Sequence, residues 1–539
     1  MNIWNLKNKS VLIVDDFDKM RLLIREILSP LMPQKITMAK NGEEAIELLE
    51  KQCFDIVLCD YKLGDGKDGQ QVLEEARHRD LLKYNATFIM ITAENTSAMV
   101  MGAIDFLPDD YISKPFTPSQ LQKRLEKASR KKAQLDNIAT AIYDKNYSKA
   151  ITLCEQRLQE SPTGQMEVLR TKGELLKKLG RLNDAENFYT SLLKERNIPW
   201  VRQSLGQVYF QKGNYSEAET QFKLLLKDNP ANVNALDWLA STLEKQGELE
   251  NSQNILQQAI RRSPKSPVRQ RKLAAIALIN GAYDVAEKAY EYAINECKHS
   301  CLSSMADCSG LIKSMIKQGK TEEASKSIEN IQKNFKNNPE ARFHTALASS
   351  VLYRETNELE KCRKNLETVL KLINSQSEEI STEAALDITK NCLALDNPEL
   401  AINVIKQLVN NHSENEQLMN QVRDIYEKAG RSEEGNAIIQ NTKKEIIRIN
   451  NEGVKLAQDG KLEQSIDFFI QAAKGLPNNA TINFNAAYSM IQQMKKTGDT
   501  GKYFSLSKTL LEQGHKIDPH NQKYFQLIKL VEDLSSQAA

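Results

Sequence analysis

The segment Phe54-Asp-Ile-Val-Leu-Cys-Asp60 contains a short apolar run, Ile56–Cys59, that ends in an acid. The segment Val11-Leu-Ile-Val-Asp-Asp16 has the same form near the start of the chain, with the run Val11–Val14 before its two acids. Continuous apolar runs of this length are typical of strands that are buried on both faces of a sheet. Further strand candidates are Ile36–Ala39, Phe88–Thr92 and Asp110–Ile112, and helical patterns such as Met20–Leu28 and Gly42–Glu50 lie between them. This alternation predicts an α/β domain, a five-stranded parallel sheet with helices on both faces.

Acidic and polar side chains follow the ends of these strands. Asp15 and Asp16 end the first strand, Asp60 ends the third, Thr92 ends the fourth and Lys114 follows the fifth. The carboxyl ends of parallel strands meet at one edge of a sheet, where loops build functional sites. Carboxylates are preferred ligands of Mg²⁺, and a hydroxyl and an ammonium could hold two oxygens of a transferred phosphoryl group. We expect Asp60 to be the nucleophile that forms an acyl phosphate.

On these residues, residues 1–118 resemble the receiver domain of two-component response regulators. The other stretches that carry the resemblance are Ala39-Lys-Asn-Gly-Glu-Glu-Ala45, Ile91-Thr-Ala93 and Tyr111-Ile-Ser-Lys-Pro-Phe116. The resemblance implies a flavodoxin-like, doubly wound sheet. It also implies a phospho-accepting signalling protein rather than an enzyme, which takes phosphate from a sensor histidine kinase or a phosphotransfer protein and sheds it slowly as inorganic phosphate.

The resemblance also implies a role for each site residue. Asp16 and Asp60 would bind Mg²⁺ directly, together with the main-chain carbonyl of Lys62, and Asp15 would act partly through water.

The remaining site residues would respond to the phosphoryl group. Thr92 and Lys114 would contact it, and Tyr111 would be a switch that turns inward when Thr92 is drawn toward the phosphate. Two alternatives stay open: Tyr111 as a packed core aromatic, and a receiver that keeps these residues but works without phosphate.

Two segments depart from the family pattern. Tyr61-Lys-Leu-Gly-Asp-Gly-Lys-Asp-Gly69 is one residue longer than usual and has glycine at the usual proline position, and Gly102-Ala-Ile-Asp-Phe-Leu-Pro-Asp-Asp110 is also longer than usual. Neither change touches the five chemical positions. Both lie on or beside surfaces that receivers use for signalling, so the family's docking modes are not assumed.

From about Leu121 the pattern becomes continuously helical and repeats every 34 residues. Leu205, Gly206, Tyr209, Gly213, Ala218, Phe222 and Pro230 recur as Leu239, Ala240, Leu243, Gly247, Ser252, Leu256 and Pro264. Such a unit needs small residues where two helices cross, a glycine near the turn and a large side chain that fills the gap. This resembles the tetratricopeptide repeat (TPR) family, whose arrays bind proteins.

We therefore predict three parts: a receiver at 1–118, a helical connector at 119–133 that continues the last receiver helix directly into the array, and an all-α TPR-like solenoid at 134–539. The solenoid would hold roughly 10–12 helical hairpins and a C-terminal capping helix. Between 298 and 450 the register is looser, with repeat centres at Gly319 with Ala324 and at Gly430 with Gly435. The leucine stripe from Leu121 leaves two alternatives: it forms a homodimer interface, or it packs its helix against the array.

Charge and composition limit the remaining classes of function. Lys and Arg (73) nearly balance Asp and Glu (71), for a net charge of +2, so we expect an unidentified output protein as partner rather than nucleic acid. A transcriptional or RNA-binding regulator that uses basic faces of the solenoid is the alternative. No apolar run is long enough for membrane insertion, and we expect a cytoplasmic protein. The only cysteine cluster, around Cys297 and Cys301, is predicted to hold no zinc.

Overall fold

A computed structural model describes residues 6–93, 108–133, 135–160, 165–195, 197–264, 266–336, 338–375, 380–412, 415–476, 479–499, 501–518 and 521–538. The chain divides into two compact units, Met1–Ser314 and Met315–Ala539, and each is described by itself. Most of the second long connection noted in the sequence, residues 102–107, lies outside the described residues.

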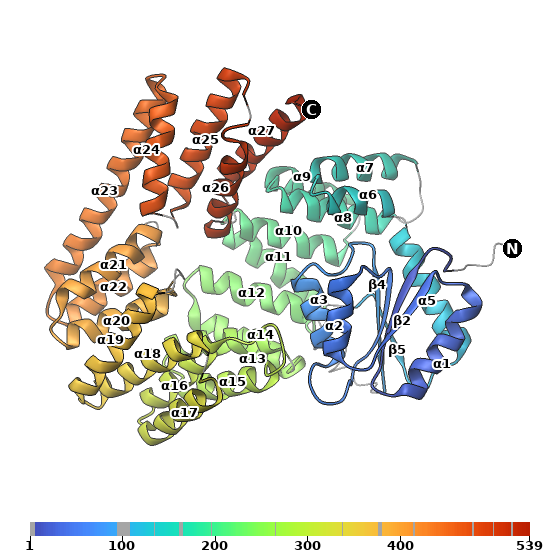
Figure 1. Cartoon of the computed structure of the whole chain (residues 1–539), viewed down its shortest axis with the longest axis horizontal. Helices are drawn as coiled ribbons and strands as arrows, with labels where there is room; N and C mark the ends of the chain where they lie inside the picture. The colour runs from blue at the N-terminus through green and yellow to red at the C-terminus, as the bar shows by residue number, and fades with distance from the viewer. Residues whose placement is uncertain are drawn as a thin grey trace. The chain divides into compact units, whose positions relative to one another are not determined.

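The first unit contains one five-stranded parallel sheet (Figure 1). Its strands are β1 (Ser10–Val14), β2 (Lys35–Ala39), β3 (Ile56–Asp60), β4 (Thr87–Thr92) and β5 (Asp110–Ser113). Their order is β2-β1-β3-β4-β5, and every neighbouring pair is parallel. The predicted sheet is confirmed, and each strand is one residue longer than predicted.

Helices cover both faces of this sheet (Figure 1). They are α1 (Asp18–Leu28), the short 3₁₀ helix η1 (Ser29–Leu31), α2 (Gly42–Lys51), α3 (Gly69–His78) and α5 (Pro118–Ala133). Successive residues of a strand point to opposite faces, so Val11 and Ile13 pack with α1 and α5, while Leu12 and Val14 pack with α2 and α3. Both faces are buried, which is why these strands read as continuous apolar runs.

The leucine stripe of α5 belongs to this core. Leu121 and Leu125 are fully buried, and they pack with Ile24 of α1 and Ile112 of β5. Both earlier alternatives for the stripe, a dimer interface and a seat on the array, are therefore wrong, because the sheet itself covers it.

The joint between sheet and repeats also differs from the prediction. Helix α5 ends at Ala133 and the next helix, α6, begins at Asp136. Leu135 between them is buried in the apolar core of the first repeats, and its backbone (φ −104°, ψ 3°) leaves the helical path. The last receiver helix therefore does not run without interruption into the array.

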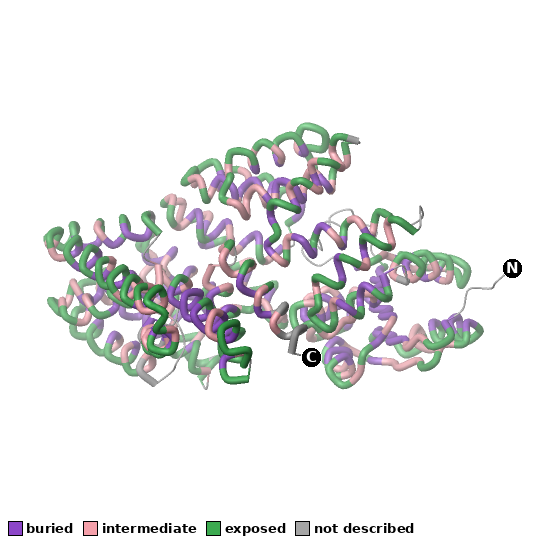
Figure 2. The backbone as a smooth tube through the Cα atoms, turned by 90° about the horizontal axis from the view of Figure 1, so that it is seen from above, coloured by how far each residue is buried: buried purple, intermediate pink, exposed green. Residues whose placement is uncertain are grey.

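The rest of the first unit consists of helical hairpins. The helices are α6 (Asp136–Tyr143), α7 (Tyr147–Glu160), α8 (Gln165–Lys178), α9 (Leu182–Glu195), α10 (Pro199–Gln211), α11 (Tyr215–Asp228), α12 (Val233–Lys245), α13 (Leu249–Arg262), α14 (Pro267–Ile279) and α15 (Tyr283–Glu296), and α16 (Met305–Lys317) crosses the unit boundary. Figure 2 shows buried residues alternating with exposed ones along the helices of the chain, as amphipathic packing requires.

The predicted small residues and turn glycines have the expected geometry. Gly213, in the turn between α10 and α11, has φ +78°, a left-handed conformation that favours glycine. A Cβ on Gly206 would lie 2.7 Å from the Phe222 ring, so α10 and α11 can cross this closely only with glycine there. The predicted repeat geometry is confirmed at these positions.

The second unit continues with hairpins in the region of looser register. Its helices are α17 (Thr321–Asn334), α18 (Pro339–Glu355), α19 (Leu359–Ser375), α20 (Thr382–Ala394), α21 (Pro398–His412), α22 (Glu416–Lys428), α23 (Ser432–Gln458), α24 (Leu462–Gly475), α25 (Ala480–Thr497), α26 (Phe504–Ile517) and α27 (Gln522–Ala538). Gly319 and Gly430 both lie in left-handed turns between paired helices. A Cβ on Gly435 would lie 2.6 Å from the Tyr426 side chain, so α22 and α23 also cross closely at a glycine.

Candidate functional site

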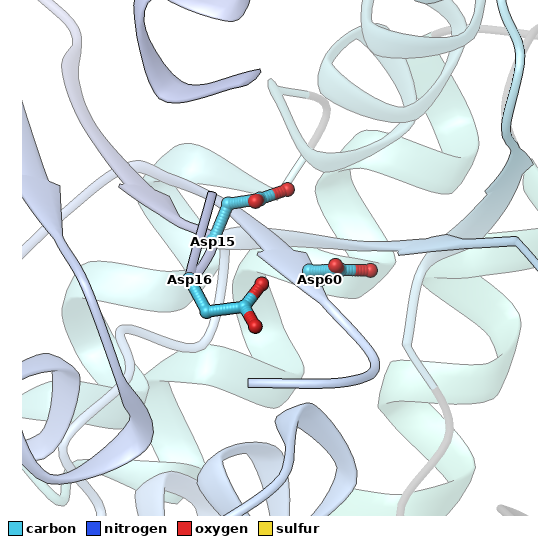
Figure 3. Close-up of side chains that lie close together, drawn as sticks. All are labelled: Asp15, Asp16 and Asp60. Carbon is cyan, nitrogen blue, oxygen red and sulfur yellow. The ribbon is translucent and has the colours of Figure 1, made fainter. Parts of the chain in front are cut away.

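Three carboxylates meet at the carboxyl end of the sheet. Asp15 and Asp16 directly follow β1, and Asp60 is the last residue of β3, which pairs with β1 so that Val14 lies opposite Cys59. Figure 3 shows the three side chains close together beyond these strand ends. Their oxygens lie within 4.8 Å of one another, Asp15 and Asp60 are buried, and Asp16 is exposed. This oxygen-rich group fits a divalent cation that keeps part of its water shell.

Lys114 neutralises part of this charge. It follows β5, and its Nζ lies 2.8 Å from Oδ2 of Asp15 and 2.8 Å from Oδ2 of Asp60. Thr92 ends β4 as a buried side chain, and the Lys114 backbone N–H donates to the Thr92 carbonyl at 2.6 Å. The structure thus brings together the acids and the ammonium that the sequence singled out, and it joins Thr92 to Lys114 through the backbone.

The electrostatics of the pocket favour an added positive charge. Burial raises the pKa of Asp60 above its ordinary value, and the charge of Asp15 adds to this, although Lys114 partly offsets both. Burial also opposes the charge of Lys114, but its hydrogen bonds to the two carboxylates outweigh burial, and the pKa of Lys114 is raised. One ammonium thus serves two buried carboxylates, with Asp16 beside them.

The long loop after Asp60 lies against the site through glycines. Gly64 and Gly66 have φ values of +76° and +105°, a left-handed region that favours glycine. A Cβ on Gly69, the first residue of α3, would lie only 2.0 Å from the main-chain oxygen of Asp60. Lys62 lies in this loop with an exposed side chain. The sequence did not predict the close approach of Gly69 to Asp60, although Gly69 belongs to the segment that departs from the family pattern.

A second residue missed from sequence is Arg21. Its Nη1 donates to the main-chain oxygen of Asp15 at 2.5 Å, and its Nη2 reaches Asp18 at 2.9 Å. It therefore positions the backbone of the acidic pair from α1. The sequence feature that could have indicated Arg21 is its position in the first turns of the helix that follows Asp15 and Asp16.

Tyr111 is packed inward. It lies on β5 opposite Met90 and packs against the core beneath α2 and α3. Its hydroxyl is buried without a hydrogen-bond partner among the described residues, and burial raises the pKa of Tyr111 to about 12.

The first unit also joins the receiver to the repeats. Lys67, in the loop after Asp60, donates to the carbonyl of His299 at 3.0 Å, and Gln71 of α3 donates to the carbonyl of Glu296 at 3.2 Å. Asn85, before β4, donates to Asp136 of α6 at 2.6 Å. No pattern in the sequence could indicate these contacts, because they join residues up to 232 positions apart.

The predicted cysteine cluster lies beside these contacts. Cys297 and Cys308 are buried, and burial raises the pKa of Cys297 to about 11. Within the described part of the chain, the acidic trio is the group of side chains arranged to hold a metal ion. None of the described helices combines the length and hydropathy that a membrane span requires.

Comparison with known proteins assigns both parts. The response regulator receiver domain model matches residues 11–126, and the tetratricopeptide repeat model matches residues 204–267 and 239–298. Chemotaxis protein CheY-3 of Vibrio cholerae is 35% identical over 121 residues, which cover 22% of this chain and 92% of that protein. CheY of Thermotoga maritima is 34% identical over 122 residues, which cover 23% of this chain and 98% of that protein. A solved response regulator of Thermotoga maritima in complex with Mg²⁺ and BeF is 30% identical over 22% of this chain and 98% of that one, with a TM-score of 0.20.

Proposed function

The chain belongs to the response regulator family, and on this basis we propose that a histidine kinase or a phosphotransfer protein phosphorylates Asp60 and that the repeats carry this state to a protein partner. The observation that carries the proposal is the group of Asp15, Asp16 and Asp60 with Lys114 Nζ 2.8 Å from two of them. We propose residues 1–118 together with α5 as the receiver, since the predicted connector at 119–133 packs on the sheet through Leu121 and Leu125, and 134–539 as the array.

The chemistry is an in-line transfer to a carboxylate. An oxygen of Asp60 forms the new bond to phosphorus while the bond between phosphorus and the donor histidine nitrogen breaks, and the released imidazole takes up a proton. Asp16, Asp60 and the main-chain carbonyl of Lys62 would hold Mg²⁺, with Asp15 partly through water, and the ion would neutralise charge on the phosphoryl oxygens. Water later releases inorganic phosphate slowly.

Lys114 and Thr92 then change partners. In the structure Lys114 binds an oxygen of Asp60, and after transfer its ammonium holds a phosphoryl oxygen instead. The Thr92 hydroxyl holds another, and the space it leaves lets Tyr111 settle further inward. In the structure Tyr111 already packs against the core, with its hydroxyl buried.

The loop after Asp60 is a route from the site to the repeats. Gly64 and Gly69 lie against Asp16 and Asp60, while Lys67 of the same loop donates to the carbonyl of His299. Any shift of Asp60 therefore reaches the turn between α15 and α16. A switch needs such a contact to differ between its two states.

The test is the mass of the intact chain after treatment with a small-molecule phosphodonor and Mg²⁺. We expect one added phosphoryl group of about 80 Da, lost slowly once the donor is removed. Asp60→Asn should abolish it, and Asp65→Asn, a change of an exposed acid in the same loop, should not. An unmodified folded protein, or equal labelling of Asp60→Asn, would contradict the proposal.

Transmission is tested by hydrogen exchange on the same samples. Phosphorylation should change exchange in residues 296–304, and Lys67→Ala should produce a similar change without phosphate. If Asp60 became labelled but hydrogen exchange in residues 296–304 did not change, phosphorylation would be supported and the proposed route to the repeats would be refuted.

A further inference from the structure

The second unit contains a groove of about 620 Å³ near its C-terminal end. One side of α25 lines it, with residues spaced three or four apart so that they share a face. These residues are Asn485, Tyr488, Ser489, Gln492, Lys495 and Lys496, and the end of α23 with parts of α24 forms the rest. Tyr488 is 41% exposed, so its ring is available to a ligand.

The groove is positively charged and lacks acids. None of the described residues that line it is acidic. Lys495 and Lys496 are exposed, and neither forms an ion pair with any described residue. Some lysines elsewhere in the repeats do have acidic partners, as in the pairs Lys212–Glu186 at 2.5 Å and Lys443–Glu416 at 2.5 Å.

A third cation lies at the other end of the α25 face. Lys523, in the first turn of α27, donates to Asn485, and its Nζ lies 5.6 Å from the centre of the Tyr488 ring. No carboxylate in the described structure contacts it, and burial lowers the pKa of Lys523. A cation in the first turn of a helix is also disfavoured by the helix dipole. Lys523 therefore lacks the anion that would balance its charge.

We propose that this groove binds an extended acidic segment of a partner protein. One carboxylate pairs with Lys523, and a second pairs with Lys495 and Lys496. Asn485 and Lys496 are 11 positions apart on α25, about 16 Å along a helix, and an extended chain covers this distance in about five residues. Tyr488 packs against the apolar stem between the two acids.

This inference deepens the proposed function, because it names the chemistry of the partner that the array binds. Groove binding does not require phosphate on Asp60. Asp60→Asn should therefore bind the acidic segment as wild type does, so failure of the phosphorylation test and failure of this one are distinguishable.

The experiment is calorimetric titration of the full chain with a peptide whose core is Glu-Ala-Ala-Ala-Glu, flanked by glycine and serine. We expect saturable binding that weakens with salt, and at least about tenfold weaker binding of the glutamine analogue Gln-Ala-Ala-Ala-Gln. Lys523→Gln and the double variant Lys495→Gln/Lys496→Gln should each weaken binding about tenfold. The matched control Lys444→Gln/Lys508→Gln, which changes two exposed lysines outside the lining, should bind as wild type does.

Several outcomes would overturn the inference. One is the absence of saturable binding below about 1 mM peptide. Others are equal affinity for the glutamine analogue, or equal losses in the control double variant. A single-stranded oligothymidylate that binds more tightly than the peptide would assign the groove to nucleic acid instead. Thermal unfolding of each variant checks its fold, and the separate changes at Lys523 and at the lysine pair keep the test valid if one variant unfolds.

Discussion

Replacing Lys114 with methionine tests the electrostatic account of the site. Methionine keeps most of the side-chain volume but removes the ammonium that lies 2.8 Å from Asp15 and from Asp60. Those two side chains are 1% and 10% exposed, so water cannot replace the lost partner well. Lys114→Met should therefore destabilise the receiver strongly at neutral pH.

The magnitude follows from this burial. Removing one partner of a buried ion pair costs about 3–5 kcal/mol, and because the Lys114 side chain is itself 18% exposed, we expect the lower end, about 3 kcal/mol. Lys83→Met is the matched control. Its partner Asp55 lies 3.3 Å away, the two side chains are 39% and 17% exposed, and such a pair contributes less than about 1 kcal/mol.

The assay is hydrogen exchange of the slowest amides of β1 and β3 in the full chain, because their exchange reports the free energy of opening. A loss of about 3 kcal/mol accelerates their exchange about 150-fold, and the control should change it less than about sixfold. Saturating Mg²⁺ should restore part of the loss, since a cation bound to the native site stabilises it.

The pH dependence has a definite sign. The pKa of Lys114 is raised in the folded state. Its contribution to folding stability is therefore fully present at any pH below the pKa of lysine in the unfolded chain. That contribution disappears only as pH rises through the folded-state pKa of Lys114. The pKa of Asp60 is already raised, and without Lys114 acid would neutralise its unpaired charge. The cost of Lys114→Met should therefore shrink as pH falls from 7 toward 5. An equal cost for both lysine variants, or a cost that grows with acid, would refute this reasoning.

Three further outcomes are expected. Gly69→Ala places a Cβ 2.0 Å from the main-chain oxygen of Asp60. This variant should destabilise the receiver by about 1–3 kcal/mol, measured by hydrogen exchange, and should abolish phosphoryl labelling of Asp60. A variant that is labelled normally would contradict the close approach. Tyr111→Phe removes a buried hydroxyl without a partner among the described residues, so stability should stay within about 1 kcal/mol of wild type or rise; a larger loss by exchange would reveal a missed partner. Because the pKa of Asp60 is raised and the ionised form is the nucleophile, labelling without Mg²⁺ should fall with acid around a midpoint above 3.8, and intact mass at several pH values decides this.

Much of the fold could be predicted because local pattern and burial agree. A strand buried on both faces, such as Ile56–Asp60, must be apolar throughout, and the acid at its end marks where the chain leaves the core. The site followed from the same fact, since the strand ends meet at one edge. Gly206 and Gly213 identified the repeat because a close helix crossing requires a small residue and a left-handed turn favours glycine.

The errors came from packing between distant segments. Leu121 and Leu125 form a helical stripe, and periodicity alone does not say which surface covers a stripe. Leu135 fits a helical pattern, yet its burial in the first repeats redirects the chain there. Tertiary contacts overrode local propensity at Leu135.

These contacts also decide how a signal could leave the site. A single helix through residues 118–143 would act as a lever, but the break at Leu135 separates α5 from α6. The loop after Asp60 instead touches the acids through its glycines and the repeats through Lys67. Gly69 has no space for a Cβ beside the main-chain oxygen of Asp60, so a displacement of Asp60 would press on the start of α3. Gln71 of the same helix donates to the carbonyl of Glu296 at the end of α15. This loop thus lies between Asp60, the proposed phosphoacceptor, and the array.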